Sequence, residues 1–446
     1  MMQLLRLGVR AAGAVALAAL VVTSLPHLSR QADAQSTVAA QPAVDPSNID
    51  PTCKACDDFF QFATGGWMKK AKIPTGLARW GSFDELQSHN REVLHAILED
   101  AAKNTSAQPG SDEQKLAAFY RSCMNTDAIE AAGTTPIQPL LDGVAAVKDT
   151  RGLIDEIVAL QRSGVGSGLA LFAQPDRIDS SKMIAGLSGG GLGMERSYYL
   201  EDRFATIRAA YRSYITAELS ALGESSDRAA HDADAILAFE TTIAKATPDR
   251  SELRDPLATY HPTPVAQLAS MAPHVAWGAF FNDYGEGGVQ SVSVTLPAVL
   301  TAFDTQLAAT PLDTWKALLR FRILDRFAGD LPKRFDDPSF AFQNGVLRGV
   351  KERLPRWLTC TTATDQTLRD VLGRAYVARA FPPSAKARAV ALVDNLQSTL
   401  RTDISSLDWM SPETKKAAIA KLDAYTKKIA YPDRWEDFSG LTVSNA

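Results

Sequence analysis

Apolar side chains recur at helical spacing in several stretches of this 446-residue chain. A capping box at residues 82–85 predicts that a helix begins there, because Ser and Glu three residues apart satisfy free backbone donors. The apolar side of this helix comprises Phe83, Leu86, Val93, Leu94, Ile97 and Leu98. A second helical run, which ends at Gly223, contains Ile207, Tyr211, Tyr214, Ile215, Leu219 and Leu222. A third begins at Ser411-Pro412 and continues with Ala418, Leu422, Tyr425 and Ile429.

Signals for β-strands are few. Residues 168–173 form a short apolar run, and Val292, Val294 and Leu296 alternate with polar residues after a Gly-rich turn. The pattern therefore predicts a mainly α protein with small β elements.

Composition narrows the class of protein. With 46% hydrophobic and 22% charged residues, the chain can bury a large core and divide into two or three domains. The 47 basic residues are outnumbered by 51 acidic ones, which argues against nucleic-acid binding because no basic excess neutralises phosphates. Four cysteines are too few for a dense disulfide framework but allow two bridges.

The N-terminus predicts export. Arg6 and Arg10 precede an uncharged apolar run at residues 11–25, and Ala32-Asp33-Ala34 follows, so residues 1–34 have the layout of a cleaved signal peptide. We therefore expect a periplasmic or extracellular protein. An uncleaved membrane anchor is the alternative, although the apolar run is shorter than a membrane span requires. Residues 35–52 are small, polar and proline-containing, and are expected to form a leader.

No familiar catalytic motif is visible in the sequence. None of the six histidines lies in H-E-x-x-H, and no zinc-type Cys/His spacing, G-x-S-x-G, phosphate-binding loop or dinucleotide fingerprint is found. His89, Glu92 and His95 spread around more than half of a helix circumference, which favours a solvated helix face over a metal site. Residues 189–191, three glycines, are interpreted as a flexible loop in preference to an anion cradle.

Several short fragments between residues 50 and 435 are nevertheless informative when they are taken together, in their order along the chain. They include CDDFFQF at 56–62, RWGSFD at 79–84, FYRSCMN at 119–125, RSYYL at 196–200, PRW at 355–357 and YPD at 431–433. In this order they resemble the N-terminal region of the neprilysin and endothelin-converting-enzyme family of zinc metalloendopeptidases. One departure from that family is Ala430, where glycine is usual.

The resemblance implies two mainly helical lobes around a chamber that admits short peptides. Residues 53–90 would flank the catalytic lobe, 91–435 would form the helical covering lobe, and 436–446 would be the truncated start of the segment leading to the catalytic part. The zinc ligands of the family follow later, in H-E-x-x-H and a downstream Glu, and this sequence ends before them. We therefore expect zinc in the complete enzyme, no metal and no catalytic residue in this chain, and no activity of the chain alone.

The resemblance also assigns roles to particular side chains. Arg79 and Asp84 match positions that line the primed-side substrate pocket. The planar guanidinium of Arg79 would bind the C-terminal carboxylate or a backbone carbonyl of a peptide. Asp84, in the first turn of its helix, would orient that guanidinium.

The two pairs of cysteines are expected to differ in whether they form a disulfide. Cys123 and Cys360 match a pair that the family joins in a disulfide. Cys53 and Cys56 form a C-x-x-C without the βαβ context of a redox motif, so they are expected to form a local bridge or to remain two unpaired thiols.

Two functions are compatible with these features. In the first, the chain is the N-terminal part of an exported neprilysin-like peptidase that acts on short peptides and needs its catalytic part in cis or in trans. In the second, it is a non-catalytic exported helical module that binds peptides or another chain. In either case a nucleic-acid partner is not expected, and a membrane contact is expected only if the signal remains uncleaved.

Overall fold

A computed structural model describes residues 45–444. The predicted signal peptide at 1–34 lies outside these residues, as do the first ten residues of the predicted leader at 35–52. The chain divides into two compact units, Met1–Trp67 and Met68–Ala446, each of which is described by itself. No helix among the described residues has the length and apolar character needed to cross a membrane.

In the first unit, the segment at residues 46–50 packs against residues 59–67 of helix α1 (Phe59–Lys70). The backbone N–H of Asp50 donates to the carbonyl of Phe62 at 2.7 Å, and Gln61 Nε2 donates to the buried Asp50 Oδ2 at 2.9 Å. A Cβ atom at Gly66 would lie 2.5 Å from the carbonyl oxygen of Ser47. The close approach of two backbones therefore requires glycine at position 66.

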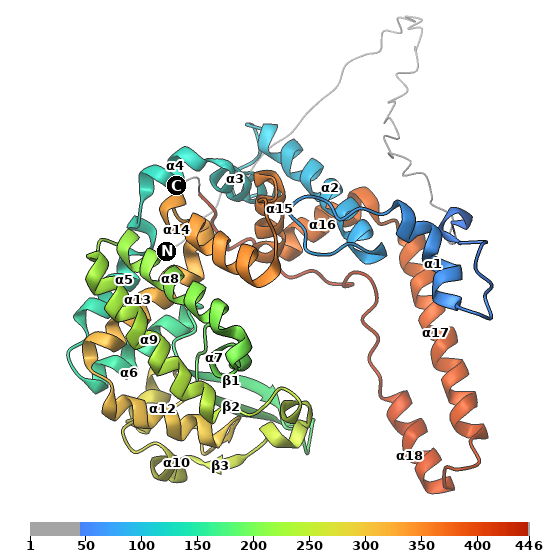
Figure 1. The fold of residues 1–446 in the computed structure, drawn as a ribbon. Helices are drawn as coiled ribbons and strands as arrows, with labels where there is room; N and C mark the ends of the chain where they lie inside the picture. Colours follow the sequence, from blue (N-terminus) through green and yellow to red (C-terminus); the bar gives the residue numbers. More distant parts are fainter. Residues whose placement is uncertain (1–44, 445–446) are drawn as a thin grey trace, which may run out of the picture. The chain divides into compact units, whose positions relative to one another are not determined.

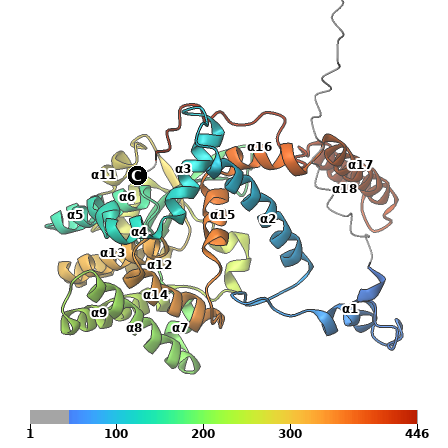
Figure 2. The ribbon, with the colours of Figure 1, turned by 90° about the horizontal axis from the view of Figure 1, so that it is seen from above.

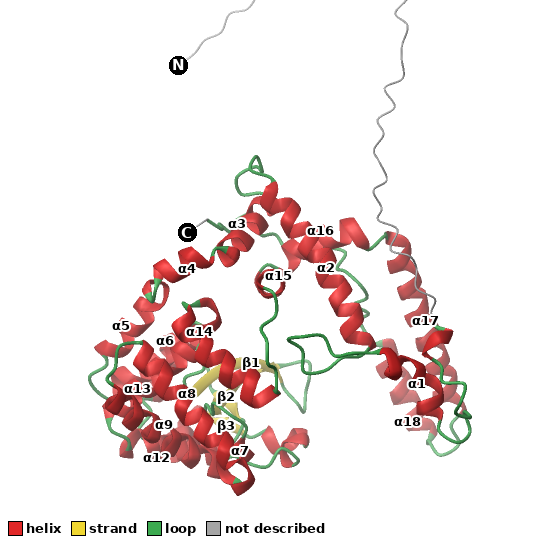
Figure 3. Cartoon of the chain, turned by 45° about the horizontal axis from the view of Figure 1, so that its top comes forward, coloured by secondary structure: helices red, strands yellow, loops and turns green. Residues whose placement is uncertain are grey.

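The second unit is predominantly helical, as Figures 1 and 3 show. Its first helices are α2 (Ser82–Lys103), α3 (Asp112–Met124), α4 (Thr126–Ala132), α5 (Gln138–Ala146), α6 (Thr150–Arg162), α7 (Arg196–Leu200), α8 (Ala205–Ala221) and α9 (Ser226–Ala246). They are followed by α10 (Val265–Met271), α11 (Trp277–Asp283), α12 (Pro297–Ala309), α13 (Leu312–Phe327), α14 (Lys333–Ser339), α15 (Arg356–Thr367), α16 (Arg369–Ala380), α17 (Pro383–Ser406) and α18 (Pro412–Asp423). The mainly α fold expected from the sequence is confirmed.

One small sheet joins four strands in the order β1-β2-β4-β3. Strands β1 (Leu169–Pro175) and β2 (Met183–Gly189) form an antiparallel hairpin, and β3 (Pro262–Pro264) pairs antiparallel with β4 (Ser291–Val294). The parallel β2–β4 pair is connected through the helices between them. Both predicted strand regions are present, but Leu296 lies beyond β4, where it precedes α12.

The second unit contains two separate apolar clusters. The larger one is built from residues of α5–α14 and the sheet, and includes the buried Trp315, Phe303 and Phe321. The smaller one joins α2, α3, α15 and α16, with Leu98 and Leu372 fully buried. A C-terminal segment packs on this smaller cluster, since Lys115 Nζ donates to the carbonyl of Phe438 at 2.6 Å.

The predicted helices exist, but two of their details are wrong. The capping box does not form: Gly81 is the N-cap of α2, no side-chain capping hydrogen bond is present there, and Ser82 is already helical. The last helix is capped as expected by Ser411, which accepts from the N–H of Thr414. It ends at Asp423, so Tyr425 and Ile429 do not continue its apolar face.

Ala430 has a φ of 64°, in the left-handed region where glycine is favoured. The backbone conformation thus explains why glycine would suit this position. The glycines at 189–191 are also explained by geometry: Gly190 N–H donates to the carbonyl of Gly168 at 2.7 Å, and a Cβ at Gly191 would lie 3.0 Å from Gly168 Cα. This run packs closely against a neighbouring turn instead of forming an open loop.

Candidate substrate-binding site

Arg79 and Asp84 lie together at the beginning of α2. Asp84 is in the first turn of the helix, and its Oδ1 is 3.6 Å from Arg79 Nε, which comes from the preceding loop. The Arg79 side chain is 88% exposed, whereas that of Asp84 is 23% exposed. Most of the guanidinium therefore faces solvent, and an exposed pair of this kind contributes only about 0–1 kcal/mol to stability. The N–H donors of the Arg79 guanidinium remain available to a ligand.

Two exposed apolar side chains belong to the same first turns of α2 as Asp84. Phe83 is 89% exposed and Leu86 56% exposed, although both belong to the helix side that was expected to be buried. That expectation fails for the first turns of α2 and holds for its later turns, where Ile97 and Leu98 are in the core. The start of α2 consequently presents an open surface that combines a cation with apolar groups.

A cavity of about 410 Å³ lies farther along the same helix, where α2 meets α15 and α16. We call it the α2–α15–α16 pocket; its lining includes Asn90, Arg91, Thr361, Asp365, Arg369 and Tyr376. The sequence analysis missed this pocket. Its residues are spread over 290 positions of the chain and form no local motif, and only their polar character on three helices could have drawn attention to them.

The disulfide expected from the family resemblance is present. Cys123 in α3 and Cys360 in α15 are joined across a sequence separation of 237 residues, with a Cα–Cα distance of 5.6 Å. Arg356, also in α15, donates from Nε and Nη2 to the carbonyl of Cys123 at 2.9 and 2.6 Å. These contacts attach α15 firmly to α3 and thereby hold one wall of the pocket in place.

The other cysteine pair is not bridged. Cys53 and Cys56, in the first unit, are both free thiols, with Cys56 exposed. Of the two alternatives that the sequence left open, the structure shows the unpaired one.

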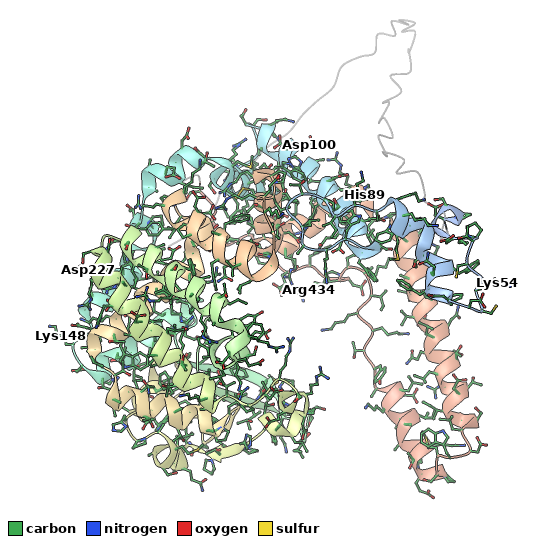
Figure 4. All side chains as sticks on the ribbon, viewed as in Figure 1. Lys54, His89, Asp100, Lys148, Asp227 and Arg434 are labelled. Atoms are coloured by element: carbon green, nitrogen blue, oxygen red, sulfur yellow. A yellow bond between two sulfur atoms is a disulfide. The ribbon has the colours of Figure 1, made fainter. Side chains whose placement is uncertain are left out.

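His89, Glu92 and His95 do not converge on one point. His89 Nδ1 is 4.0 Å from Glu92 Oε2 on the exposed side of α2, where Figure 4 labels His89. His95 instead stacks on Trp357 of α15 with ring centroids 4.2 Å apart. Within residues 45–444, no group of three or more His, Cys, Asp or Glu side chains is arranged to hold a metal ion. The described residues do not fit a zinc site.

The family-like fragment at residues 196–200 contributes Tyr199 to a buried network. Tyr199 Oη donates to Glu240 Oε2 at 2.8 Å, and Tyr211 Oη donates to Glu240 Oε1 at 3.2 Å. Arg322 forms a buried ion pair with the same carboxylate and also donates to the carbonyl of Gly191. Burial raises the pKa of Tyr199, so its hydroxyl stays protonated and remains a donor. These residues connect α7, α8, α9 and α13 and have a structural role.

Comparison with known proteins agrees with this architecture. Residues 55–432 match the N-terminal part of peptidase family M13. Human endothelin-converting enzyme 1 is 28% identical over 406 residues, which cover 87% of this chain and 51% of that protein. The chain therefore spans about half the length of the curated relatives it matches.

Solved structures with the same fold are also found. A zinc metalloprotease of Mycobacterium tuberculosis, Zmp1 in complex with an inhibitor, is 30% identical with a TM-score of 0.83, covering 90% of this chain and 61% of that one. PepO from Lactobacillus rhamnosis has a TM-score of 0.76 at 19% identity, covering 87% of this chain and 61% of its own, and supports the fold alone.

Proposed function

We propose, since the chain belongs to peptidase family M13, that it is the N-terminal part of an exported zinc metalloendopeptidase that hydrolyses short peptides. The observation that carries this proposal is the exposed Arg79 beside Asp84 at the start of α2. Arginine in such a position is suited to peptide ends, because its planar fork matches the two oxygens of a carboxylate.

Arg79 binds the C-terminal carboxylate or a backbone carbonyl of the substrate, and Asp84 orients the guanidinium. The geometry supports this division of roles. Arg79 carries the exposed donors, whereas Asp84 is mostly shielded and is held in the first turn of a helix, where the helix dipole favours a negative charge. Exposed Phe83 and Leu86 supply apolar surface next to this contact.

The zinc and the residues that activate water belong to the catalytic part of the enzyme. The sequence contains no H-E-x-x-H, and residues 45–444 do not fit a metal site, so no step of hydrolysis is assigned to this chain's own side chains. We propose that the chain alone is inactive and that it works with a catalytic part supplied in cis or in trans. Export to the periplasm or the extracellular space follows from the signal-like residues 1–34.

Two measurements test the proposal. The first is the coding sequence beyond codon 446, which should encode H-E-x-x-H and a downstream Glu; unrelated sequence after a stop codon there, with no separate catalytic chain, would overturn the proposal. The second is peptide hydrolysis by the purified 446-residue chain with added zinc. We expect none above background, and hydrolysis that a chelator abolishes would contradict the predicted inactivity.

The role of Arg79 is tested in the chain joined to its catalytic part. Arg79→Ala should lower kcat/KM by about 10- to 100-fold for a peptide with a free C-terminal carboxylate, the usual effect of losing one charged hydrogen bond. The same peptide with an amidated C-terminus should be affected much less. Arg388→Gln, an exposed arginine of α17, is the matched control. Equal losses for acid and amide peptides would exclude carboxylate recognition by Arg79.

A further inference from the structure

The α2–α15–α16 pocket contains charged side chains that the protein itself does not use. Arg91, Asp365 and Arg369 line it, and none of the three has an ion pair or hydrogen bond within residues 45–444. Other arginines of the same helix α16 are engaged: Arg374 is 3.1 Å from Asp112 and Arg379 is 2.7 Å from Asp100. The three charged side chains that line the pocket are therefore unpaired, whereas Arg374 and Arg379 of α16 form ion pairs.

A buried hydroxyl at the pocket is also without a partner. Thr361, Thr362 and Thr364 lie close together in α15, and two of them donate to the carbonyl four residues earlier: Thr362 to Leu358 at 2.9 Å and Thr364 to Cys360 at 2.8 Å. Thr361 lines the pocket, is completely buried, and its Oγ1 has no partner in the described chain. Buried polar groups are normally satisfied, so the Thr361 hydroxyl adds an unused hydrogen-bonding group to the unpaired charges of the same pocket.

The pocket is held in shape before any ligand arrives. Tyr376 Oη donates to Asn90 Oδ1 at 3.1 Å and so connects α16 to α2, which leaves the amide group of Asn90 free to donate. Burial raises the pKa of Tyr376, so this hydroxyl keeps its proton. The Cys123–Cys360 disulfide and the stacking of His95 on Trp357 fix the third helix, α15. A preformed site loses little conformational entropy on binding.

We propose that the α2–α15–α16 pocket binds a peptide segment that carries an acidic side chain. Two unpaired guanidiniums are the preferred partners of a carboxylate, while the unpaired Asp365 accepts an N–H of the peptide backbone. Amide and hydroxyl groups complete the lining. The volume of about 410 Å³ accommodates one side chain with its flanking backbone and lies within the usual range for ligand pockets.

This site goes beyond the proposed function, because it involves neither Arg79 nor Asp84. It lies on later turns of α2, and its lining residues come from three helices of one compact unit. A peptide bound there is recognised by an acidic side chain, whereas Arg79 recognises a peptide end. The two proposals therefore fail independently of each other.

The test is calorimetric titration of the 446-residue chain with acetyl-Ala-Glu-Ala-amide, which has no free C-terminus for Arg79 to bind. Acetyl-Ala-Gln-Ala-amide and glutarate serve as the second and third ligands. The variants are Arg91→Gln and Arg369→Gln, with Arg388→Gln in α17 as matched control and Arg79→Ala to separate the two sites. Circular dichroism confirms that each variant is folded.

We expect the Glu peptide to bind, and the Gln peptide and either pocket variant to weaken binding by about tenfold or more, as the loss of a charged hydrogen bond requires. The Arg388→Gln and Arg79→Ala proteins should bind as the unaltered chain does. Absence of binding, equal affinity for the Glu and Gln peptides, or unchanged affinity of folded pocket variants would overturn the proposal. If glutarate bound as tightly as the Glu peptide, the proposal would be overturned, because the pocket would then recognise a free carboxylic acid and not a peptide.

Discussion

Two buried carboxylates of neighbouring helices show how the surroundings of a single residue determine its chemistry. Glu240 in α9 forms an ion pair with Arg322 and accepts hydrogen bonds from the hydroxyls of Tyr199 and Tyr211. Glu218 in α8 is equally buried, yet both of its oxygens are without a partner in the described chain. Burial, with nearby Asp325 and Asp336 as further causes, raises the pKa of Glu218 from 4.5 to about 9. Glu218 is consequently neutral at pH 7.

The pH dependence of stability should reveal this carboxyl group. Because the folded state holds the Glu218 proton more tightly than the unfolded chain does, its contribution is complete below pH 4.5 and is lost as the pH rises towards about 9. Glutamine at position 218 cannot ionise. The free energy of unfolding of Glu218→Gln minus that of the unaltered chain should therefore be greater at pH 9 than at pH 5, by at least about 1 kcal/mol. Urea unfolding at both pH values measures the difference. The exposed Glu286→Gln is the control, and the same pH response in both variants would contradict the assignment.

At the scale of elements, helix α15 owes its position to contacts with distant parts of the chain. Its Cys360 is bonded to Cys123, its Arg356 donates to the same residue's carbonyl, and its Trp357 stacks on His95 of α2. Cys360 and Thr364 are buried in or beside the smaller apolar cluster. Three helices of this cluster, α2, α15 and α16, line the α2–α15–α16 pocket, so the stability of the cluster and the shape of the pocket are linked.

Removing the disulfide tests how much it contributes to the stability of the chain. The double variant Cys123→Ala/Cys360→Ala should lose up to about 5 kcal/mol of unfolding free energy, because the bridge closes a loop of 237 residues and restricts the unfolded chain. Urea unfolding followed by circular dichroism is the measurement. Cys53→Ser/Cys56→Ser, which removes the free thiols, should leave the transition unchanged. An unchanged midpoint in the alanine variant would show that the bridge adds nothing to stability.

At the scale of the whole molecule, helices α17 and α18 lie side by side, as Figures 1 and 2 show, but leave much apolar surface open. Leu392, Leu396 and Leu400 of α17 are four residues apart on one helix face and are 61%, 62% and 46% exposed. Every residue of α17 is exposed or half-buried within residues 45–444. An apolar stripe of this kind is typical of an interface, which agrees with the proposal that a catalytic part completes the protein.

The stripe should make the isolated chain prone to aggregation. Leu392→Gln/Leu396→Gln should reduce light scattering of the concentrated chain and change its unfolding free energy by no more than about 0.5 kcal/mol, since neither side chain is buried. Leu319→Gln, at a fully buried position of α13, is the contrasting control and should destabilise strongly. Equal scattering before and after the double substitution would place the aggregating surface elsewhere.

Local signals in the sequence were sufficient for the class of fold and for three of the helices, α2, α8 and α18. The run that ends at Gly223 is α8, with Tyr211, Tyr214 and Ile215 buried as predicted, and Ser411 caps α18. Helical periodicity is a property of neighbouring residues and can therefore be recognised along the chain. The fragments that resemble a peptidase family were equally visible, and they gave the Cys123–Cys360 pairing, which the residues alone could not.

Only the tertiary structure decided which apolar positions are covered and which polar groups meet. Apolar residues occur in both the first and the later turns of α2, yet Phe83 is exposed and Leu98 is buried, because α3, α15 and α16 pack on the later turns. Arg91 and Arg369 share a pocket for the same reason: three helices from distant parts of the sequence meet there. The sequence by itself determined the mainly α class, three of the helices and the family resemblance, since these depend on local patterns, whereas burial and the pocket depend on contacts that no local pattern records.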